Sequence, residues 1–144
     1  MKADPRRRQR SPYPFWIEVP LRYADMDTMG HVNNVAHVAF LQEARVCFLR
    51  RLFEVEKTDF GATRLFIARL EIDYLREARY PGLMDVGVGV LRTGRTSYTL
   101  GLASFMGDEC ISAADAVMVH GDSSGPAPLT EKVRARLAEF ALRF

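Results

Sequence analysis

Apolar residues follow two different periods along the chain. From Phe15 to Tyr23 every second residue is apolar, which is typical of a half-buried β-strand. Pro20 has no N–H to give to a neighbouring strand, so we expect this strand at an edge or an irregular position of its sheet. Between about residues 34 and 53 the apolar positions cover most sides of a helix, which predicts a long and largely buried helix.

The second half of the chain predicts four further strands and a closing helix. The alternating stretches are 66–74, 84–90, 96–106 and 110–120, and an amphipathic helix is expected at about 130–142. Tyr80-Pro81-Gly82 and Gly94 mark turns, and Gly107-Asp108 indicates a hairpin. The order of one strand, one long helix, four strands and a final helix predicts an α+β fold, in which a strongly curved antiparallel sheet wraps round the long helix.

Length and charge limit the domain organisation and the partners. A chain of 144 residues fits one domain, which we place at 13–144. Residues 1–12 contain Arg6, Arg7, Arg8 and Arg10, and we expect them to form a flexible basic tail. The net charge is only +2, so no nucleic-acid partner is expected. The chain has neither a membrane-spanning apolar run nor an apolar signal core, which predicts a cytoplasmic protein without a membrane partner.

Residues 25–34 hold the candidate chemistry. They read Asp-Met-Asp-Thr-Met-Gly-His-Val-Asn-Asn and stand directly before the long helix. Either asparagine can cap that helix, and the glycine favours a turn. A helix N-terminus offers unpaired N–H groups and a partial positive charge, which can polarise a carbonyl that a nearby carboxylate attacks. No zinc-type ligand spacing and no phosphate-binding glycine loop accompanies this segment.

These residues resemble a known family. The string from Arg22 to Asn34, followed by Glu43-Ala44-Arg45, is similar to the 4-hydroxybenzoyl-CoA thioesterase-like family of hotdog-fold acyl-CoA thioesterases. The resemblance covers nearly all of the chain after residue 15 and includes Gly94-Arg95-Thr96-Ser97. It implies a hotdog fold, a homodimer or homotetramer with sites at the subunit interface, and hydrolysis of an acyl-CoA. Coenzyme A would then be part of the substrate, and no separate cofactor is expected.

The resemblance also implies roles for two residues at the start of the helix. Asp27 would be the catalytic carboxylate, as a nucleophile or as a general base on water. The backbone N–H of Asn34 would polarise the thioester carbonyl and stabilise the tetrahedral oxyanion. Gly30 is expected to shape the turn, and Asn33 to orient the loop or a water. His31 either contacts the substrate or only fixes the turn.

Other candidates surround this pair. Asp25 is expected to bind loop amides or Arg22, and Glu43 to pair with Arg45 or another arginine. Position 37 is a histidine where many relatives of the family carry tyrosine, so His37 is expected at the acyl pocket. The residues expected to contact the nucleotide of coenzyme A, with a solvated hairpin end as the alternative, are Arg92, Arg95, Thr96 and Ser97.

Two other functions fit the same sequence. The first is a thioesterase that acts on an acyl-carrier protein, which would use the same site on a protein-borne thioester. The second is a non-catalytic hotdog protein that binds acyl thioesters. The presence of Asp27 in its Gly-His-Val-Asn-Asn context favours an enzyme over this binding protein.

Overall fold

A single antiparallel sheet forms the framework of the computed structural model, which describes residues 3–144. Its strands within this range are paired in the order β1-β3-β4-β5-β2, and the short β6 pairs with β5. The strands are β1 (Phe15–Pro20), β2 (Arg64–Tyr74), β3 (Leu83–Thr93), β4 (Ser97–Met106), β5 (Glu109–Asp122) and β6 (Gly125–Pro126). The helices are α1 (Asn34–Leu52) and α2 (Glu131–Glu139), with 3-10 turns η1 (Pro5–Arg8) and η2 (Tyr23–Asp25).

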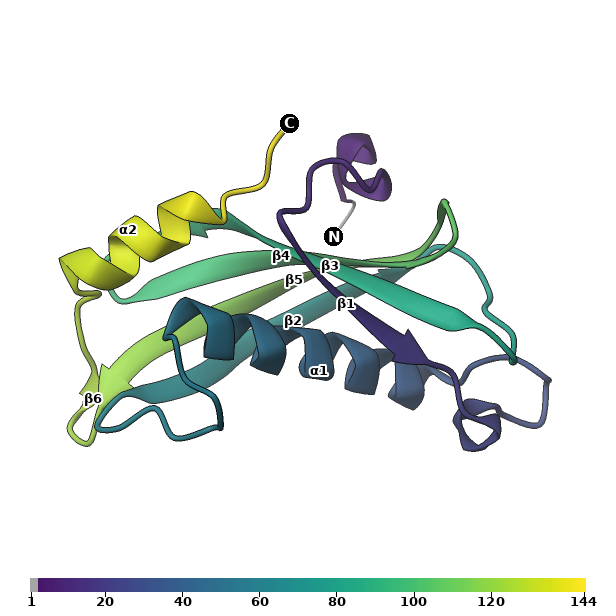
Figure 1. Cartoon of the computed structure of the whole chain (residues 1–144), viewed down its shortest axis with the longest axis horizontal. Coiled ribbons are helices and arrows are strands. Elements are labelled where there is room, and N and C mark those ends of the chain that lie inside the picture. The colour runs from purple at the N-terminus through teal and green to yellow at the C-terminus, as the bar shows by residue number, and fades with distance from the viewer. Residues whose placement is uncertain (1–2) are drawn as a thin grey trace.

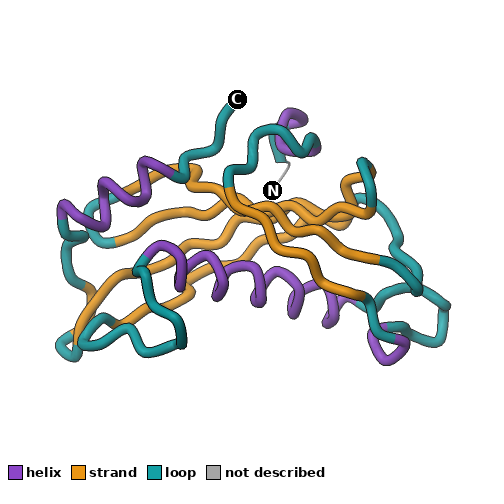
Figure 2. Tube along the Cα trace, in the orientation of Figure 1, coloured by secondary structure: helices purple, strands orange, loops and turns teal. Residues whose placement is uncertain are grey.

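The sheet curves round α1, as Figures 1 and 2 show. Leu41, Ala44 and Phe48 on α1 are fully buried, and they belong to one core with alternate residues of β3, β4 and β5. A helix with apolar residues on most sides needs such a wrapping surface, because burying that area supplies most of its stability. The expected α+β architecture, its element order and the edge position of β1 are therefore confirmed.

The N-terminal segment (residues 3–14) differs from the expected flexible tail. It packs on the outer face of the sheet, where Figure 1 shows it above the strands. Arg7 is buried, and its guanidinium binds the Asp115 carboxylate at 2.6 Å and the Ala114 carbonyl at 2.7 Å. The hydroxyl of Tyr13 donates to the Arg7 carbonyl. Residues 1 and 2, also part of the expected tail, lie outside the described residues.

Charge complementarity explains this packing. Three strands each present an aspartate to the N-terminal segment, and composition alone does not show that these carboxylates share the outer face. Asp73 on β2 accepts from the Ala3 N–H, Asp85 on β3 pairs with Arg10, and Asp115 on β5 pairs with Arg7. Arg7 and Arg10, two of the four arginines that suggested a solvated tail, therefore fasten the segment to the sheet.

The C-terminal end covers the same outer face. α2 ends at Glu139, three residues earlier than expected, and the N–H of Leu142 donates to the Val90 carbonyl of β3. Leu142 then lies over Gly89, where an added Cβ would come within 2.6 Å of its Cδ2 atom. Gly89 is therefore needed for close approach of the terminal segment. No helix within residues 3–144 is long and apolar enough to span a membrane.

Candidate active site

The loop before α1 is held by backbone hydrogen bonds that fix the direction in which the helix starts. The N–H of Asn33 donates to the Asp25 carbonyl, and the N–H of Val32 donates to Ala78 beyond β2. The Asn33 side chain caps α1 by accepting from the Ala36 N–H at 2.8 Å. Gly30 has φ +80°, a left-handed conformation that favours glycine, so the expected turn and cap are confirmed.

The cap gives a measurable stability effect. We expect Asn33→Ala to lower the free energy of unfolding by about 1 kcal/mol, because an N–H of the first turn loses its acceptor. Asn33→Asp keeps an acceptor at the same position and should stay close to the parent. Chemical denaturation of the three proteins measures the difference. Equal losses in both variants would show that the cap is not the reason.

Asp27 has one engaged oxygen and one free oxygen. Its Oδ1 accepts from the Met29 N–H at 2.9 Å and from the His31 N–H at 3.3 Å. Its Oδ2 has no hydrogen-bond partner among residues 3–144. The loop thus orients the carboxylate through its backbone and leaves one oxygen available to a water or a substrate.

Asn34, the first residue of α1, also has an unpaired group. Within the described part of the chain, the Asn34 N–H has no acceptor, as expected for the first turn of a helix. Asn34 and Asp27 both line a cavity of about 280 Å³, which we call the α1 cavity. The Tyr74 hydroxyl donates to the Asn34 carbonyl at 3.4 Å, so the end of β2 is tied to the start of the helix. Asp27, which has a free carboxylate oxygen, and Asn34, which has an unpaired N–H, therefore line one small space.

The last residue of β2 and the three residues after it complete the α1 cavity, and the sequence did not single them out as site residues. Tyr74, Leu75, Arg76 and Glu77 line it together with His31 and His37. The hydrophobic pattern placed Tyr74 at the end of a strand, but gave no sign that this end meets the start of α1. That contact depends on the pairing of β2 with β5, which is long-range.

His31 contributes to the loop through both its backbone and its ring. Its carbonyl accepts from the Asp27 N–H at 2.8 Å, so the residue fixes the turn. This was one of the two roles predicted for His31. Its Nε2 lies 3.0 Å from the Glu77 carboxylate and 3.0 Å from the Arg79 guanidinium. These contacts hold the ring at the wall of the α1 cavity.

His37 lies one turn into α1 and lines the α1 cavity, and its place at an acyl pocket stays a prediction. Its ring is 5% exposed and packs edge-on against Tyr74 and Phe40. Burial lowers the pKa of His37, so the ring is neutral at pH 7. Its Nδ1 is buried without a hydrogen-bond partner among the described residues. The residue thus adds a neutral imidazole to the wall of the α1 cavity, next to the ring of Tyr74.

Asp25 supports the loop, as expected. It is 3% exposed, and its carboxylate accepts from the Arg22 N–H at 2.8 Å and from the Arg22 guanidinium at 2.9 Å. Burial alone would raise the pKa of Asp25, but the hydrogen bonds and charge of Arg22 outweigh it and lower the pKa. Asp25 therefore stays ionised and positions the loop.

This shift gives a pH dependence with a defined sign. Because the pKa of Asp25 is lower in the folded state, its stabilising effect is present above its unfolded pKa of roughly 4 and is lost as the pH falls through the folded value. We expect Asp25→Asn to destabilise the protein most at pH 6–7 and progressively less below about pH 4. Denaturant unfolding of both proteins across this range checks it. A difference that stays constant with pH would contradict the role of the charge.

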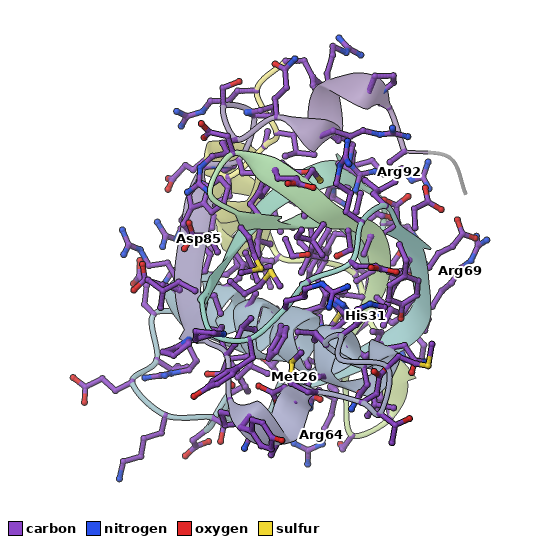
Figure 3. The ribbon with its side chains drawn as sticks, turned by 90° about the vertical axis from the view of Figure 1, so that its right-hand side faces the viewer. Met26, His31, Arg64, Arg69, Asp85 and Arg92 are labelled. Carbon is purple, nitrogen blue, oxygen red and sulfur yellow. The ribbon has the colours of Figure 1, made fainter. Side chains whose placement is uncertain are left out.

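The residues expected to contact the nucleotide do not lie near Asp27 within one chain. Arg92, Arg95, Thr96 and Ser97 lie where β3 turns into β4, and His31 and Arg92 are well separated in Figure 3. Tyr74 aligns through β5 with Ser104, whereas Ser97 is seven residues earlier on β4. At about 3.3 Å per residue this separation is roughly 23 Å. Within one chain, the expected nucleotide contacts are therefore at the far end of the sheet from Asp27.

Glu43 and Arg45 do not pair. The Glu43 carboxylate accepts from the Cys47 thiol, and no ion pair joins it to a residue of the described range. Residues two apart on a helix point to nearly opposite sides. The predicted ion pair between Glu43 and Arg45 is therefore wrong. Arg45 instead faces β2 and has no ion pair within residues 3–144.

Comparison with known proteins agrees with this geometry. A curved sheet wrapped round one long helix, with polar residues at the helix start, defines a protein of the hotdog fold. The family model of the Thioesterase-like superfamily matches residues 21–137, and the chain belongs to this superfamily. Among the residues described, no cluster of histidine, cysteine, aspartate or glutamate side chains could hold a metal ion.

Solved structures share the fold over most of the chain. A thioesterase from Thermus thermophilus, complexed with coenzyme A and Zn, is 29% identical, with a TM-score of 0.79 over 90% of this chain and 95% of that one. The PA5185 protein of Pseudomonas aeruginosa PAO1 is 27% identical, with a TM-score of 0.83 over 93% of this chain and 96% of that one.

One relative is similar in sequence. The uncharacterized protein YsmA of Bacillus subtilis is 24% identical over 120 residues, covering 82% of this chain and 80% of YsmA.

Proposed function

We propose that the protein hydrolyses an acyl-CoA thioester to a free acid and coenzyme A at the α1 cavity. The observation that carries this proposal is that Asp27, which has one free carboxylate oxygen, and Asn34, which has an unpaired N–H, line the same cavity. Membership of the Thioesterase-like superfamily and the coenzyme A complex of the Thermus thermophilus protein support the substrate class.

The reaction uses these two groups in one of two ways. As a general base, Asp27 takes a proton from a water whose oxygen attacks the thioester carbon. As a nucleophile, Asp27 itself attacks that carbon and forms a mixed anhydride, which water then hydrolyses. In both routes the Asn34 N–H stabilises the oxyanion, the C–S bond breaks, and the coenzyme A thiolate leaves and takes up a proton. Single turnover in ¹⁸O-water identifies the nucleophile route when water attacks the Asp27 carbon of the anhydride, because the label then enters Asp27 and the product acid carries an unlabelled Asp27 oxygen.

A second copy of the chain would complete the site. β2 is an edge strand, and it exposes Phe66 at 47%, Ile67 at 43% and Tyr74 at 50%. Long edge strands with exposed apolar residues are usually covered by a partner. If two copies pair antiparallel along β2, the Tyr74 end of one strand meets the Arg64 end of the other. The β3–β4 turn, with Arg92 and Arg95, lies at that end and would then approach the α1 cavity of the other copy.

A thiol-release assay tests the proposed function. The purified chain is incubated with short, long, branched and aromatic acyl-CoAs, and with the same acyl groups on an acyl-carrier protein. The proposal expects turnover of at least one acyl-CoA. Turnover confined to carrier-protein thioesters would favour the other thioesterase function, and no turnover of either set would favour a binding protein.

A further inference from the structure

The ring of His37 has two nitrogens, and neither has a hydrogen-bond partner among residues 3–144. Nδ1 is buried, whereas Nε2 is not among the buried atoms of the described residues. The residue lines the α1 cavity, so the open nitrogen lies at the edge of that space. Polar groups in a protein interior usually have a partner, so an unpartnered ring nitrogen beside a cavity indicates a group that the cavity receives.

The single proton of the neutral ring is expected on Nε2. Burial lowers the pKa of His37, so the imidazole is neutral at pH 7 and carries one N–H. A proton on Nδ1 would leave a buried donor without any acceptor, which is costly. A proton on Nε2 meets the contents of the cavity instead. His37 therefore presents one hydrogen-bond donor to the α1 cavity and needs an oxygen there to accept.

The His37 ring lies close to the place where the thioester carbonyl is proposed to bind. His37 follows Asn34 by three residues, on the same side of α1 and about 4.5 Å further along its axis. Helical side chains lean toward the N-terminus, which brings the ring back toward Asn34. Tyr74 joins the two places, because its ring packs on His37 at 5.7 Å between centroids while its hydroxyl donates to the Asn34 carbonyl. An acyl group whose carbonyl accepts from the Asn34 N–H therefore passes His37 within its first few carbons.

The size and charge of the α1 cavity limit the acyl group. Its volume of about 280 Å³ lies just below the roughly 300–1,000 Å³ of cavities for larger ligands, so it suits a short chain. Asp27 and Glu77 both line it, and two carboxylates disfavour a third. A neutral N–H donor beside these carboxylates suits an uncharged hydroxyl. On the third carbon, such a hydroxyl is close enough to the carbonyl for both groups to contact α1 together.

We propose that His37 is a specificity residue that donates from Nε2 to a hydroxyl on the third carbon of a short acyl group. The preferred substrates are then short 3-hydroxyacyl-CoAs. This role of His37 rests on the proposed thioester hydrolysis at the α1 cavity and adds which acyl group the site selects.

Two acyl-CoAs of nearly equal shape test the proposal. 3-Hydroxybutanoyl-CoA and 3-methylbutanoyl-CoA differ only in a hydroxyl or a methyl group on the third carbon. In the parent, the better enantiomer of the hydroxylated thioester should have a kcat/KM at least about fivefold above that of the methyl compound, as expected for one added hydrogen bond. The ratio of the two kcat/KM values within one protein cancels any general loss of activity or of folded protein.

A matched pair of variants shows whether the His37 donor sets this ratio. His37→Gln keeps an N–H donor near the position of Nε2 and should retain the preference for the hydroxylated thioester. His37→Met has a similar length without a donor, so its ratio should fall at least about fivefold below that of the parent.

Two control variants locate the effect. His120→Met removes the other buried histidine with an unpartnered Nδ1, which stacks on Phe53 and does not line the α1 cavity. Arg45→Met removes a cation beside the first half of β2, which a copy paired along β2 would bring to the same site. Both variants should keep the ratio of the parent within about twofold, because neither removes the proposed hydrogen bond.

Nitrogen resonances of the ¹⁵N-labelled parent should show the His37 proton on Nε2 at pH 7. The proposal is overturned if this proton is on Nδ1, if the parent does not prefer the hydroxylated thioester, or if Arg45→Met rather than His37→Met removes the preference. Each of these results leaves thioester hydrolysis at the α1 cavity standing. Absence of turnover with every acyl-CoA would instead overturn the proposed hydrolysis, and the role of His37 with it.

Discussion

Asp27→Asn should lower kcat for acyl-CoA hydrolysis at least about a hundredfold, the usual scale for a lost catalytic acid or base. Asparagine keeps the oxygen that accepts from the Met29 and His31 N–H groups, so the loop should hold its shape. The substitution removes the negative charge and the free carboxylate oxygen. Steady-state thiol release from the best substrate of the panel measures the effect.

Asp122→Asn is the matched control. Asp122 also accepts from the N–H two residues later, at Ser124, but it ends β5 and does not line the α1 cavity. It should leave kcat within about twofold of the parent. If Asp27→Asn retained near-parent activity while its fold was intact, Asp27 would not be the catalytic carboxylate.

Arg7→Met should lower the free energy of unfolding by about 3 kcal/mol. Removing one member of a buried ion pair typically costs 3–5 kcal/mol, because the other charge remains without its partner. The low end applies because the Asp115 side chain is 27% exposed and keeps some contact with water. The Ala114 carbonyl also loses its donor. Urea denaturation of parent and variant measures the change.

Two further proteins show whether the pair is responsible. Arg8→Met alters the neighbouring exposed arginine and should change stability by less than about 0.5 kcal/mol. The double variant Arg7→Met with Asp115→Leu replaces both charges by apolar groups and should recover part of the loss. An Arg7→Met protein as stable as Arg8→Met would instead support the flexible tail expected from composition.

Local pattern was enough to predict most elements of the fold. The alternation in 66–74 and 110–120 and the apolar surface of 34–53 depend on near neighbours, and they gave the strands and α1. The cap at Asn33 and the turn at Gly30 follow from side-chain chemistry within a few residues. The support of the loop by Asp25 is local in the same way, since its partner is Arg22.

Contacts between residues far apart in the sequence could not be predicted from local pattern. The pairing of Arg7 with Asp115 joins positions 108 residues apart, and nothing in the basic N-terminus indicates that carboxylate. The approach of Tyr74 to Asn34 depends on the register between β2 and β5. The position of Arg95 far from Asp27 follows from the length of β4, which local motifs do not encode.

The most direct test of the account is the place where the thioester carbonyl binds. A ketone analogue of the best acyl-CoA, with a methylene group in place of sulphur, keeps the carbonyl and cannot be hydrolysed. Added to ¹⁵N-labelled protein, it should shift the Asn34 amide resonance more than any other amide, because that N–H gains an acceptor. A second cavity is lined by Glu18 and Phe40, among other residues. An unchanged Asn34 resonance, with the largest shifts at that cavity instead, would contradict the proposed position of the carbonyl.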